Sequence, residues 1–385
     1  MKRFAIALLA AGLAACSTTK DTAAPPSELT DFERGARIDR IWSADTGWGT
    51  TDKWIALRPF VAGERLVAAN VGGRVSARTL DAGDREWATD VDARLSAGVG
   101  GTDATVAVGT EAGTVVALSA EDGSERWRTQ LDGELLAPPA GGDGMLVVRT
   151  VDGRVVALDE GSGDTRWSYS TDVPSLSLRG NGRPLLVAGG VLAGLDNGRL
   201  IALSAQNGQP LWQSTIAEPT GSSPVDRMVD IDGAIGIGRR VAYAVTYQGR
   251  IAQVQPRDGN VEWARDMSSY AGLSADGQRV YVSTADSHVV ALDPATGDTL
   301  WRQETLAHRR LTAPVAVPGT EFLAVGDLEG YVHILTRADG RIVNRRSIGG
   351  ASILADPVPV AEGRIAVQDR GDDLAVLEVG PLEDQ

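Results

Sequence analysis

The chain repeats one unit, and its clearest copy is Ser287-His288-Val289-Val290-Ala291-Leu292-Asp293-Pro294-Ala295-Thr296-Gly297-Asp298-Thr299-Leu300-Trp301. The run Val-Val-Ala-Leu is typical of a strand that is buried on both faces. The glycine ten residues after the start supplies the positive φ that a tight turn requires. The segment after that glycine carries the tryptophan and predicts a second strand.

Six further copies of this unit can be aligned along the chain. They begin at Gly73, Gly113, Gly153, Gly198, Gly249 and Gly330, where the copy above has Ser287. Their turn glycines, with that of the copy above, are Gly83, Gly123, Gly163, Gly208, Gly259, Gly297 and Gly340. The tryptophans are Trp87, Trp127, Trp167, Trp212, Trp263 and Trp301, and the last copy has Asn344 instead. A period of this regularity predicts one structural unit for each copy.

Each unit is preceded by further strand signals. One example is the apolar run 145–148, which Asp152-Gly153, a hairpin dipeptide, joins to the unit that follows. Before it lies another apolar segment, Leu135-Leu136-Ala137, which predicts an innermost strand. Four strands per copy is the content of one β-propeller blade. No helical period occurs, so the sequence predicts an all-β fold.

The two ends of the chain complement each other. The tail 371–377 predicts the third strand of an eighth unit that lacks its tryptophan strand, and Ile41-Trp42 predicts a tryptophan strand with no unit before it. Pairing the two would complete a blade and leave no sheet edge exposed. We therefore predict an eight-bladed β-propeller of four-stranded antiparallel blades over residues 35–385, closed by the N- and C-terminal strands. The alternative, a seven-bladed ring, leaves both end pieces unpaired.

The N-terminus carries the signs of a secreted protein. Lys2 and Arg3 precede an apolar run, residues 4–13, and small residues follow it, which predicts a signal peptide over residues 1–15. The run is shorter than the roughly 20 residues that span a bilayer. Residues 16–34 are largely polar and predict a tether with no core of its own.

Cys16 is the only cysteine of the chain, so it cannot form an internal disulfide. Leu13-Ala14-Ala15-Cys16 resembles the lipobox of bacterial lipoproteins. This resemblance implies that Cys16 is acylated and becomes the first residue of the mature chain. Because Ser17 and not aspartate follows, it also implies the outer membrane as destination, with the protein facing the periplasm. The alternative is an ordinary signal peptide with a chance cysteine.

The composition argues against nucleic acid as a partner. The chain has 51 acidic and 37 basic residues, a net charge of −14, and such a body repels phosphate backbones. Its hydrophobic content of 43% is ample for a large core.

The segment 291–301 is similar to the tryptophan-docking motif of eight-bladed quinoprotein-type propellers. In that superfamily the tryptophan of one blade packs against the next blade. The resemblance implies this blade-docking role for Trp42, Trp87, Trp127, Trp167, Trp212, Trp263 and Trp301. With the lipobox and the chain length, the sequence resembles the BamB family, the lipoprotein subunits of the outer-membrane β-barrel assembly machinery.

Two segments carry this closer resemblance, Val173-Pro174-Ser175-Leu176-Ser177-Leu178-Arg179-Gly180 and residues 221–232. They are similar to the loops by which the family contacts the periplasmic POTRA domains of BamA. The resemblance implies a non-enzymatic scaffold that binds a BamA-like partner, reaches the other lipoproteins of the complex indirectly and touches outer-membrane lipid through its acylated end. It assigns partner binding to Leu176, Leu178, Arg179, Asp230 and Asp232.

The residues support these two loops independently. The two largest adjacent tryptophan spacings run from Trp167 to Trp212 and from Trp212 to Trp263. Strands alternate in direction, so the connections from a tryptophan strand to the next blade all lie on one face, and long connections on a regular scaffold are usually functional. Leu176 and Leu178 alternate with serines, which suggests an apolar contact surface. The alternative is that both loops pack on the propeller's own face.

Two other classes of function stay open at this point. A quinone-cofactor dehydrogenase shares the repeat, but such enzymes also carry a pair of adjacent cysteines and a calcium site, so no cofactor is expected. Asp230-Ile231-Asp232-Gly233 looks like a calcium loop, yet Met228 replaces an oxygen ligand. The three histidines, His288, His308 and His333, lack metal-ligand spacing. The second class is a propeller adaptor of another envelope complex.

Overall fold

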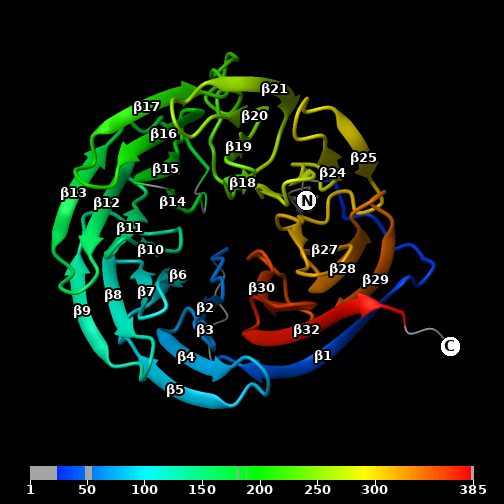
Figure 1. Ribbon diagram of the computed structural model, residues 1–385, viewed down its shortest axis with the longest axis horizontal. Coiled ribbons are helices and arrows are strands. Elements are labelled where there is room, and N and C mark those ends of the chain that lie inside the picture. Colours follow the sequence, from blue (N-terminus) through cyan, green and yellow to red (C-terminus); the bar gives the residue numbers. More distant parts are fainter. Residues whose placement is uncertain (1–23, 48–53, 179, 181, 188, 383–385) are drawn as a thin grey trace, which may run out of the picture.

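A computed structural model describes residues 24–47, 54–178, 180, 182–187 and 189–382 of the chain. These residues form 32 β-strands and no helix, so none of their elements is a helix that could cross a membrane. The sheets stand around a central axis like the blades of a propeller (Figure 1). The fold is therefore an all-β propeller.

The N-terminal half of the propeller is built from consecutive four-stranded groups. They are β2 (Phe60–Ala62), β3 (Arg65–Ala69), β4 (Arg74–Thr79) and β5 (Arg85–Asp90); β6 (Leu95–Gly101), β7 (Thr105–Thr110), β8 (Thr114–Ser119) and β9 (Glu125–Gln130); β10 (Ala140–Gly142), β11 (Met145–Arg149), β12 (Arg154–Asp159) and β13 (Thr165–Ser170); and β14 (Leu185–Val187), β15 (Gly190–Gly194), β16 (Arg199–Ser204) and β17 (Pro210–Thr215). One parallel pairing, Ala140 with Gly101, joins β10 to β6 and so merges two of these groups into one eight-stranded sheet.

The second half follows the same order, except at the end of the chain. The groups are β18 (Gly236–Gly238), β19 (Val241–Val245), β20 (Gly249–Val254) and β21 (Val261–Met267); β22 (Leu273–Ala275), β23 (Val280–Ser283), β24 (Val289–Leu292) and β25 (Thr299–Gln303); and β26 (Val315–Ala316), β27 (Phe322–Gly326), β28 (Tyr331–Thr336) and β29 (Ile342–Ser347). The last sheet holds β30 (Val358–Ala361), β31 (Arg364–Gln368), β32 (Asp373–Pro381) and β1 (Ala36–Asp45).

That last sheet combines the two ends of the chain. β1 pairs antiparallel with β32 from Ala36 opposite Pro381 to Asp45 opposite Asp373, and Trp42 lies opposite Val376. The fourth strand of this sheet thus comes from the N-terminus and its other three strands from the C-terminus. In Figure 1 the blue and red strands lie side by side at the lower right.

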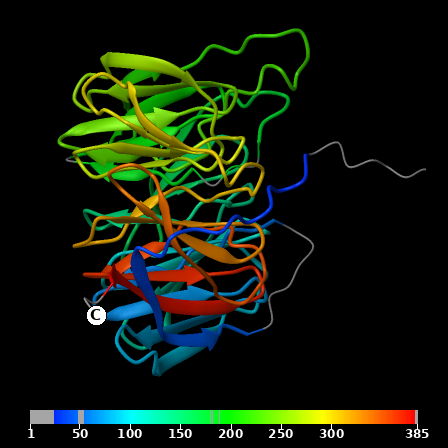
Figure 2. The same ribbon diagram turned by 90° about the vertical axis from the view of Figure 1, so that its right-hand side faces the viewer.

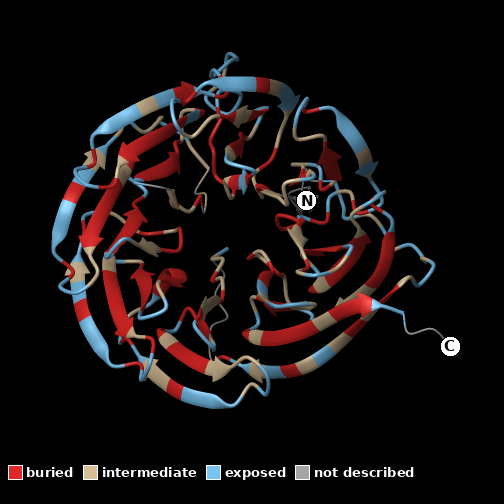
Figure 3. Ribbon diagram, viewed as in Figure 1, coloured by how far each residue is buried: buried red, intermediate tan, exposed pale blue. Residues whose placement is uncertain are grey.

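The hydrophobic core lies between neighbouring sheets. Third strands such as β12 are buried on both faces at their centre, as their apolar runs predict. Fourth strands form the exposed rim (Figure 3), and in β13 Trp167 alone is buried. The core clusters combine residues of successive sheets, for example Val75 with Val106 and Val116. Most of the apolar surface is therefore buried between blades.

Each repeat tryptophan contacts the next blade in the same way. The indole N–H donates to a carbonyl of that blade at 2.8–3.1 Å, with the pairs Trp42 to Leu80, Trp87 to Ala120, Trp127 to Glu160, Trp167 to Ala205, Trp212 to Pro256, Trp263 to Pro294 and Trp301 to Arg337. The ring lies over the turn glycine of that blade. At Gly123, for example, φ is +73° and a Cβ would lie 2.4 Å from the Trp87 ring. The turn glycine is thus required twice, for its backbone angle and for the space it leaves.

The repeat is interrupted at Asn344, which has no ring to place on a turn. Its side chain is buried and donates instead to the carbonyl of Ala36 at 2.6 Å, at the start of β1. At this position a side-chain hydrogen bond stands where the other described contacts have an indole, beside a backbone bond from Gly35 N–H to Val343 O at 3.0 Å.

The innermost strand before β11 differs from our expectation. Leu135 is buried but makes only an isolated bridge to Thr150, and the strand itself is β10, which begins at Ala140. Pro138 and Pro139 intervene, and a proline cannot donate a hydrogen bond to a sheet. The strand therefore starts only after them.

The N-terminal segment also differs from the tether we expected over residues 16–34. Leu29 and Phe32 pack against a core cluster of the propeller. Ser27 donates from its backbone to Ala307 at 3.0 Å, and Arg309 donates to the Ser27 carbonyl at 2.8 Å. Leu29 and Phe32, together with these hydrogen bonds, pack the polar segment against the propeller from Ser27 onward.

Candidate functional site

The two loops singled out by sequence follow the fourth strands of successive sheets. Residues 173–180 lie between β13 and β14, and residues 221–232 lie between β17 and β18. In side view, green loops project to the right of the disk, and the blue N-terminal segment leaves the disk on that side (Figure 2). We call this side of the propeller the loop face.

The two loops contact each other. The backbone N–H of Leu178 donates to the Asp230 carboxylate. Gly180 lies directly against Asp232, since a Cβ at Gly180 would be 2.0 Å from a carboxylate oxygen of that residue. The second loop is fixed in turn to the sheets beneath it, because Ile231 N–H donates to Leu195 O at 3.2 Å. The first loop therefore rests on the second.

Both aspartates, to which the resemblance assigns partner binding, are buried. Asp230 is 0% and Asp232 3% exposed. Beside them an ion pair of Arg149 and Asp196, itself about nine-tenths buried, comes from the neighbouring sheets. One oxygen of Asp230 and both oxygens of Asp232 accept no hydrogen bond from any residue that the structure describes.

Burial changes the acidity of this cluster. Loss of hydration raises the pKa of Asp230 to about 6, although the N–H of Leu178 opposes the shift, and the charge of Asp196 adds to it. Burial and the charge of Asp230 raise the pKa of Asp232 well above its ordinary value. The Arg149 guanidinium opposes both shifts. The cluster therefore holds its protons to a higher pH than exposed aspartates do.

The exposed part of the site is apolar. Leu176 is 40% exposed, and Leu178 is partly buried. Val225, at the tip of the second loop, is 52% exposed. Val151, in the turn between β11 and β12, is 39% exposed and borders a cavity of about 190 Å³ together with Leu178. These side chains offer a partner an apolar contact next to a hollow.

Some of the residues expected at the site lie outside the described part of the chain. They are Arg179 of the first loop and Cys16 of the lipobox. The described residues contain no group of three or more potential metal ligands.

Sequence reasoning missed four members of this region: Arg149, Val151, Asp196 and Val225. Val151 had a signal, because an apolar residue in a Thr-Val-Asp-Gly turn is unusual where turns are polar. Arg149 and Asp196 had none. They come from different sheets, and only the fold brings them beneath the loops.

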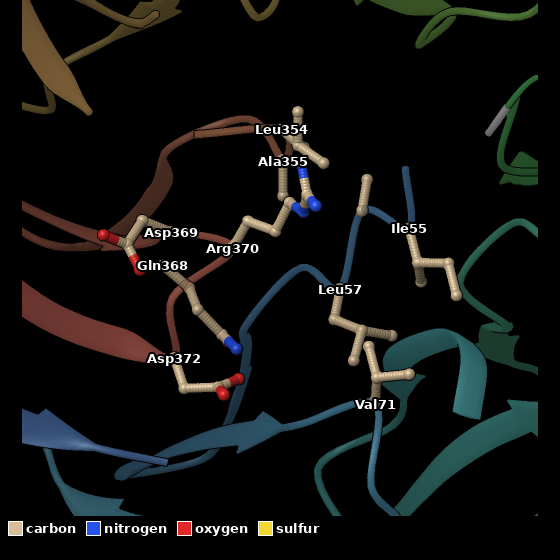
Figure 4. A pocket seen from close by; sticks show the side chains of 10 residues that line it. Ile55, Leu57, Val71, Leu354, Ala355, Gln368, Asp369, Arg370 and Asp372 are labelled. Carbon is tan, nitrogen blue, oxygen red and sulfur yellow. The ribbon is translucent and has the colours of Figure 1, made fainter. Parts of the chain in front are cut away.

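Two more hollows open toward the axis. The larger, about 710 Å³, is bordered by Leu178 and Asp232 and extends across the centre of the ring. The smaller, about 20 Å³, has room for little more than one water molecule (Figure 4). In Figure 4 the side chain of Arg370 points toward Leu354 and Ala355. The segment that carries Ile55 and Leu57 lines the same hollow. This small hollow marks where that segment packs against the last blade.

Known proteins share the sequence and the architecture of this chain. The family described as "Outer membrane protein assembly factor BamB" matches residues 71–303 and 285–380. The chain is similar to the outer membrane protein assembly factor BamB of Pseudomonas aeruginosa, with 48% identity over 93% of this chain and 94% of that protein. The crystal structure of BamB from Moraxella catarrhalis superposes with a TM-score of 0.80 at 30% identity, over 89% of this chain and 100% of that one.

A europium-containing methanol dehydrogenase shares the fold at a TM-score of 0.71 but only 12% identity, over 89% of this chain and 93% of that one. The fold and the tryptophan contacts thus define a β-propeller with a repeated indole contact between neighbouring blades. Within that class, the chain belongs to the BamB family.

Proposed function

We propose that this protein is a non-enzymatic scaffold of outer-membrane protein assembly that binds the POTRA domains of a BamA-like subunit through its loop face. The family supports the coarse function, since its named members are outer membrane protein assembly factors. The finer proposal rests on one observation above all, the hydrogen bond from Leu178 N–H to Asp230 that joins the two loops.

In this proposal some site residues contact the partner and others position the loops. Leu176 and Val225 are exposed and would enter the partner, because partly exposed apolar side chains become anchors when an interface buries them. Asp230 and Asp232 are buried and would act by holding the first loop on the second. Arg179 stays a proposed contact on the strength of its place in the sequence.

Co-purification of a BamA-like partner tests the contact. Leu176→Ala should weaken association by about 1–2 kcal/mol, the size expected for an apolar interface anchor. Leu300→Ala is the matched control, since Leu300 is 48% exposed but lies on β25 at the rim. Equal binding by wild type and Leu176→Ala, or equal loss in both variants, would contradict the proposed contact.

The positioning role of Asp230 needs a separate test. Asp230→Asn keeps an oxygen that can accept from Leu178 and should retain partner binding. Asp230→Ala removes the acceptor and should weaken binding, with the circular dichroism spectrum of the β fold unchanged. If both variants bind alike, the hydrogen bond does not position the loop.

The outer-membrane association of the family agrees with the lipobox, and we propose that Cys16 is acylated and holds the protein at the periplasmic side. Lipid chains anchor a body to a bilayer surface without crossing it. Cys16→Ala should move the protein to the soluble fraction in cells that lack the partner. Retention in the outer membrane there would count against the anchor.

We further propose that the ring has eight blades and closes through the sheet of β1 with β30, β31 and β32. The pairing of β1 with β32 supports this interpretation, as does the division of the eight-stranded sheet at the single β6–β10 bridge. A truncation before β32 should then expose an open edge and lower the melting temperature sharply.

A further inference from the structure

The cavity on the axis of the ring contains two arginines that the proposed function does not use. Arg58 precedes β2, and Arg183 follows the first site loop. Both guanidinium groups line the cavity, and neither has a hydrogen bond or ion pair to a described residue. Two cations thus face one cavity.

Both arginines stand on well-fixed backbone. Arg58 exchanges two backbone hydrogen bonds with β6, from its N–H to Gly98 O at 2.8 Å and from Val99 N–H to its carbonyl at 2.7 Å. Arg183 follows Gly182, which lies against the second loop, since a Cβ there would be 2.9 Å from Ile231 O. The position of the two charges is therefore set by the fold.

Other charged side chains also border the cavity. Asp356 is held by the N–H of Ala313 at 2.9 Å, and its charge attracts both Arg58 and Arg183 without forming an ion pair with either. Asp232 and Asp286 line the wall, as does Arg310, whose guanidinium lies 4.2 Å from the ring centroid of Trp54. Asp356 is the carboxylate that acts on both arginines.

Bringing two guanidinium groups together away from water is unfavourable. Burial and the neighbouring charge of Arg183 lower the pKa of Arg58 to about 10, and burial also lowers the pKa of Arg183. A bound anion would relieve this repulsion. The planar fork of arginine matches the two oxygens of a carboxylate or phosphate group.

We propose that the central cavity is an oxyanion-binding site in which Arg58 and Arg183 hold a carboxylate or phosphate group. The volume of about 710 Å³ suits a small organic molecule. Apolar residues of the wall, among them Leu311, Ile353 and Leu354, leave room for a hydrocarbon part beside the charged group. The ligand class is thus a small organic acid or phosphate ester.

Titration calorimetry on the purified protein tests this site, with inorganic phosphate and acetate as probes and chloride at matched ionic strength as the reference. We expect saturable binding of phosphate or acetate beyond chloride. Arg58→Gln and Arg183→Gln should each weaken it about tenfold, the equivalent of one charge-assisted hydrogen bond. Preference for phosphate would assign a phosphate ester, and preference for acetate an organic acid.

Two further variants make the test selective. Arg257→Gln removes an arginine whose side chain is 92% exposed, in the turn between β20 and β21, and should leave binding unchanged. Asp356→Asn removes the competing carboxylate and should tighten binding severalfold. No saturable binding of either probe, equal loss in Arg257→Gln, or weaker binding in Asp356→Asn would each overturn the proposal. Circular dichroism of every variant shows whether the β fold is kept.

Discussion

The rim and the loop face of this propeller differ in whether their buried polar atoms have hydrogen-bond partners. At the rim an apolar ring, Trp127 for example, is 9% exposed, and its single polar atom reaches a carbonyl at 2.9 Å. On the loop face Asp230 and Asp232 are buried more completely, yet three of their four oxygens have no described donor. The rim thus pairs the polar atom that it buries, whereas the loop face retains unfavourable burial at the proposed binding site.

The largest effect should come from removing a rim tryptophan. Trp127→Ala leaves a cavity between two blades and an unpaired carbonyl at Glu160, so it should lower the free energy of unfolding by about 3–5 kcal/mol. Chemical denaturation measures the loss. The control is Trp54→Ala, because Trp54 is 52% exposed and should cost little stability. Equal losses at Trp54 and Trp127 would contradict the stabilising role of the buried rim ring.

The turn glycine beneath the ring is the second test. Gly123→Ala would place a Cβ 2.4 Å from the Trp87 ring at a φ of +73°, and should destabilise the protein by about 3 kcal/mol. Gly63→Ala carries a similar positive φ but has no atom within 4 Å of the new Cβ, so about 1 kcal/mol is expected there. Equal losses in denaturation would mean that the ring contact adds nothing to the backbone strain.

On the loop face, the direction of the effect should reverse. The pKa of Asp230 in the folded protein is about 6, above its ordinary value of 3.8, so between these pH values the folded state binds more protons than the unfolded state. Stability from this group therefore falls as the pH rises from about 4 to 6. Asp230→Asn should remove that slope and stabilise the protein at pH 8 by about 2 kcal/mol.

The matched control for Asp230 lies in the same loop. Hydrogen bonds from Ser223 lower the pKa of the exposed Asp226, so Asp226→Asn should not stabilise the protein at any pH. Denaturation of both variants at pH 4.5, 6 and 8 gives the comparison. A wild-type protein whose stability does not change between pH 4.5 and 6, or an Asp230→Asn variant weaker than wild type at pH 8, would break the contrast between rim and loop face.

The smallest effect is expected where the rim lacks its tryptophan. Asn344→Ala removes one hydrogen bond to Ala36 and should lower stability by about 1 kcal/mol. The melting temperature should fall measurably less than for Trp127→Ala. A loss as large as that of the tryptophan variant would show that the contact between the last two sheets depends on this one amide.

The rim could be predicted because its contacts repeat with the sequence period. Gly163 and Trp167 recur at fixed spacing, and the partner of each tryptophan is the next copy of the same turn. The two loops could be placed on one face for the same reason, since strand direction alternates.

The interior of the site could not be predicted in this way. Asp232 lies within the field of the Arg149 charge and against the backbone of Gly180, and no local pattern links either residue to it. Arg58, Arg183 and Asp356 are far apart in sequence and meet only because each follows a fourth strand and ends near the axis. The packing of Leu29 and Phe32 against the propeller could not be predicted either, because two apolar residues in a polar stretch show no periodic pattern.

The pairing of β1 with β32 has a consequence for how the molecule is made. β1 is synthesised long before β32, yet it can pair only when β32 is present, because Ala36 lies opposite Pro381. Contacts between residues so distant along a chain form slowly, because the entropy cost of closing the long loop precedes the stabilisation that the contacts give. Until β32 has been synthesised the chain therefore presents β1 as an unpaired edge, which other polypeptides can join. Without β32, β1 would lack its partner strand, and Trp42 would lose the sheet that positions its ring on the next blade.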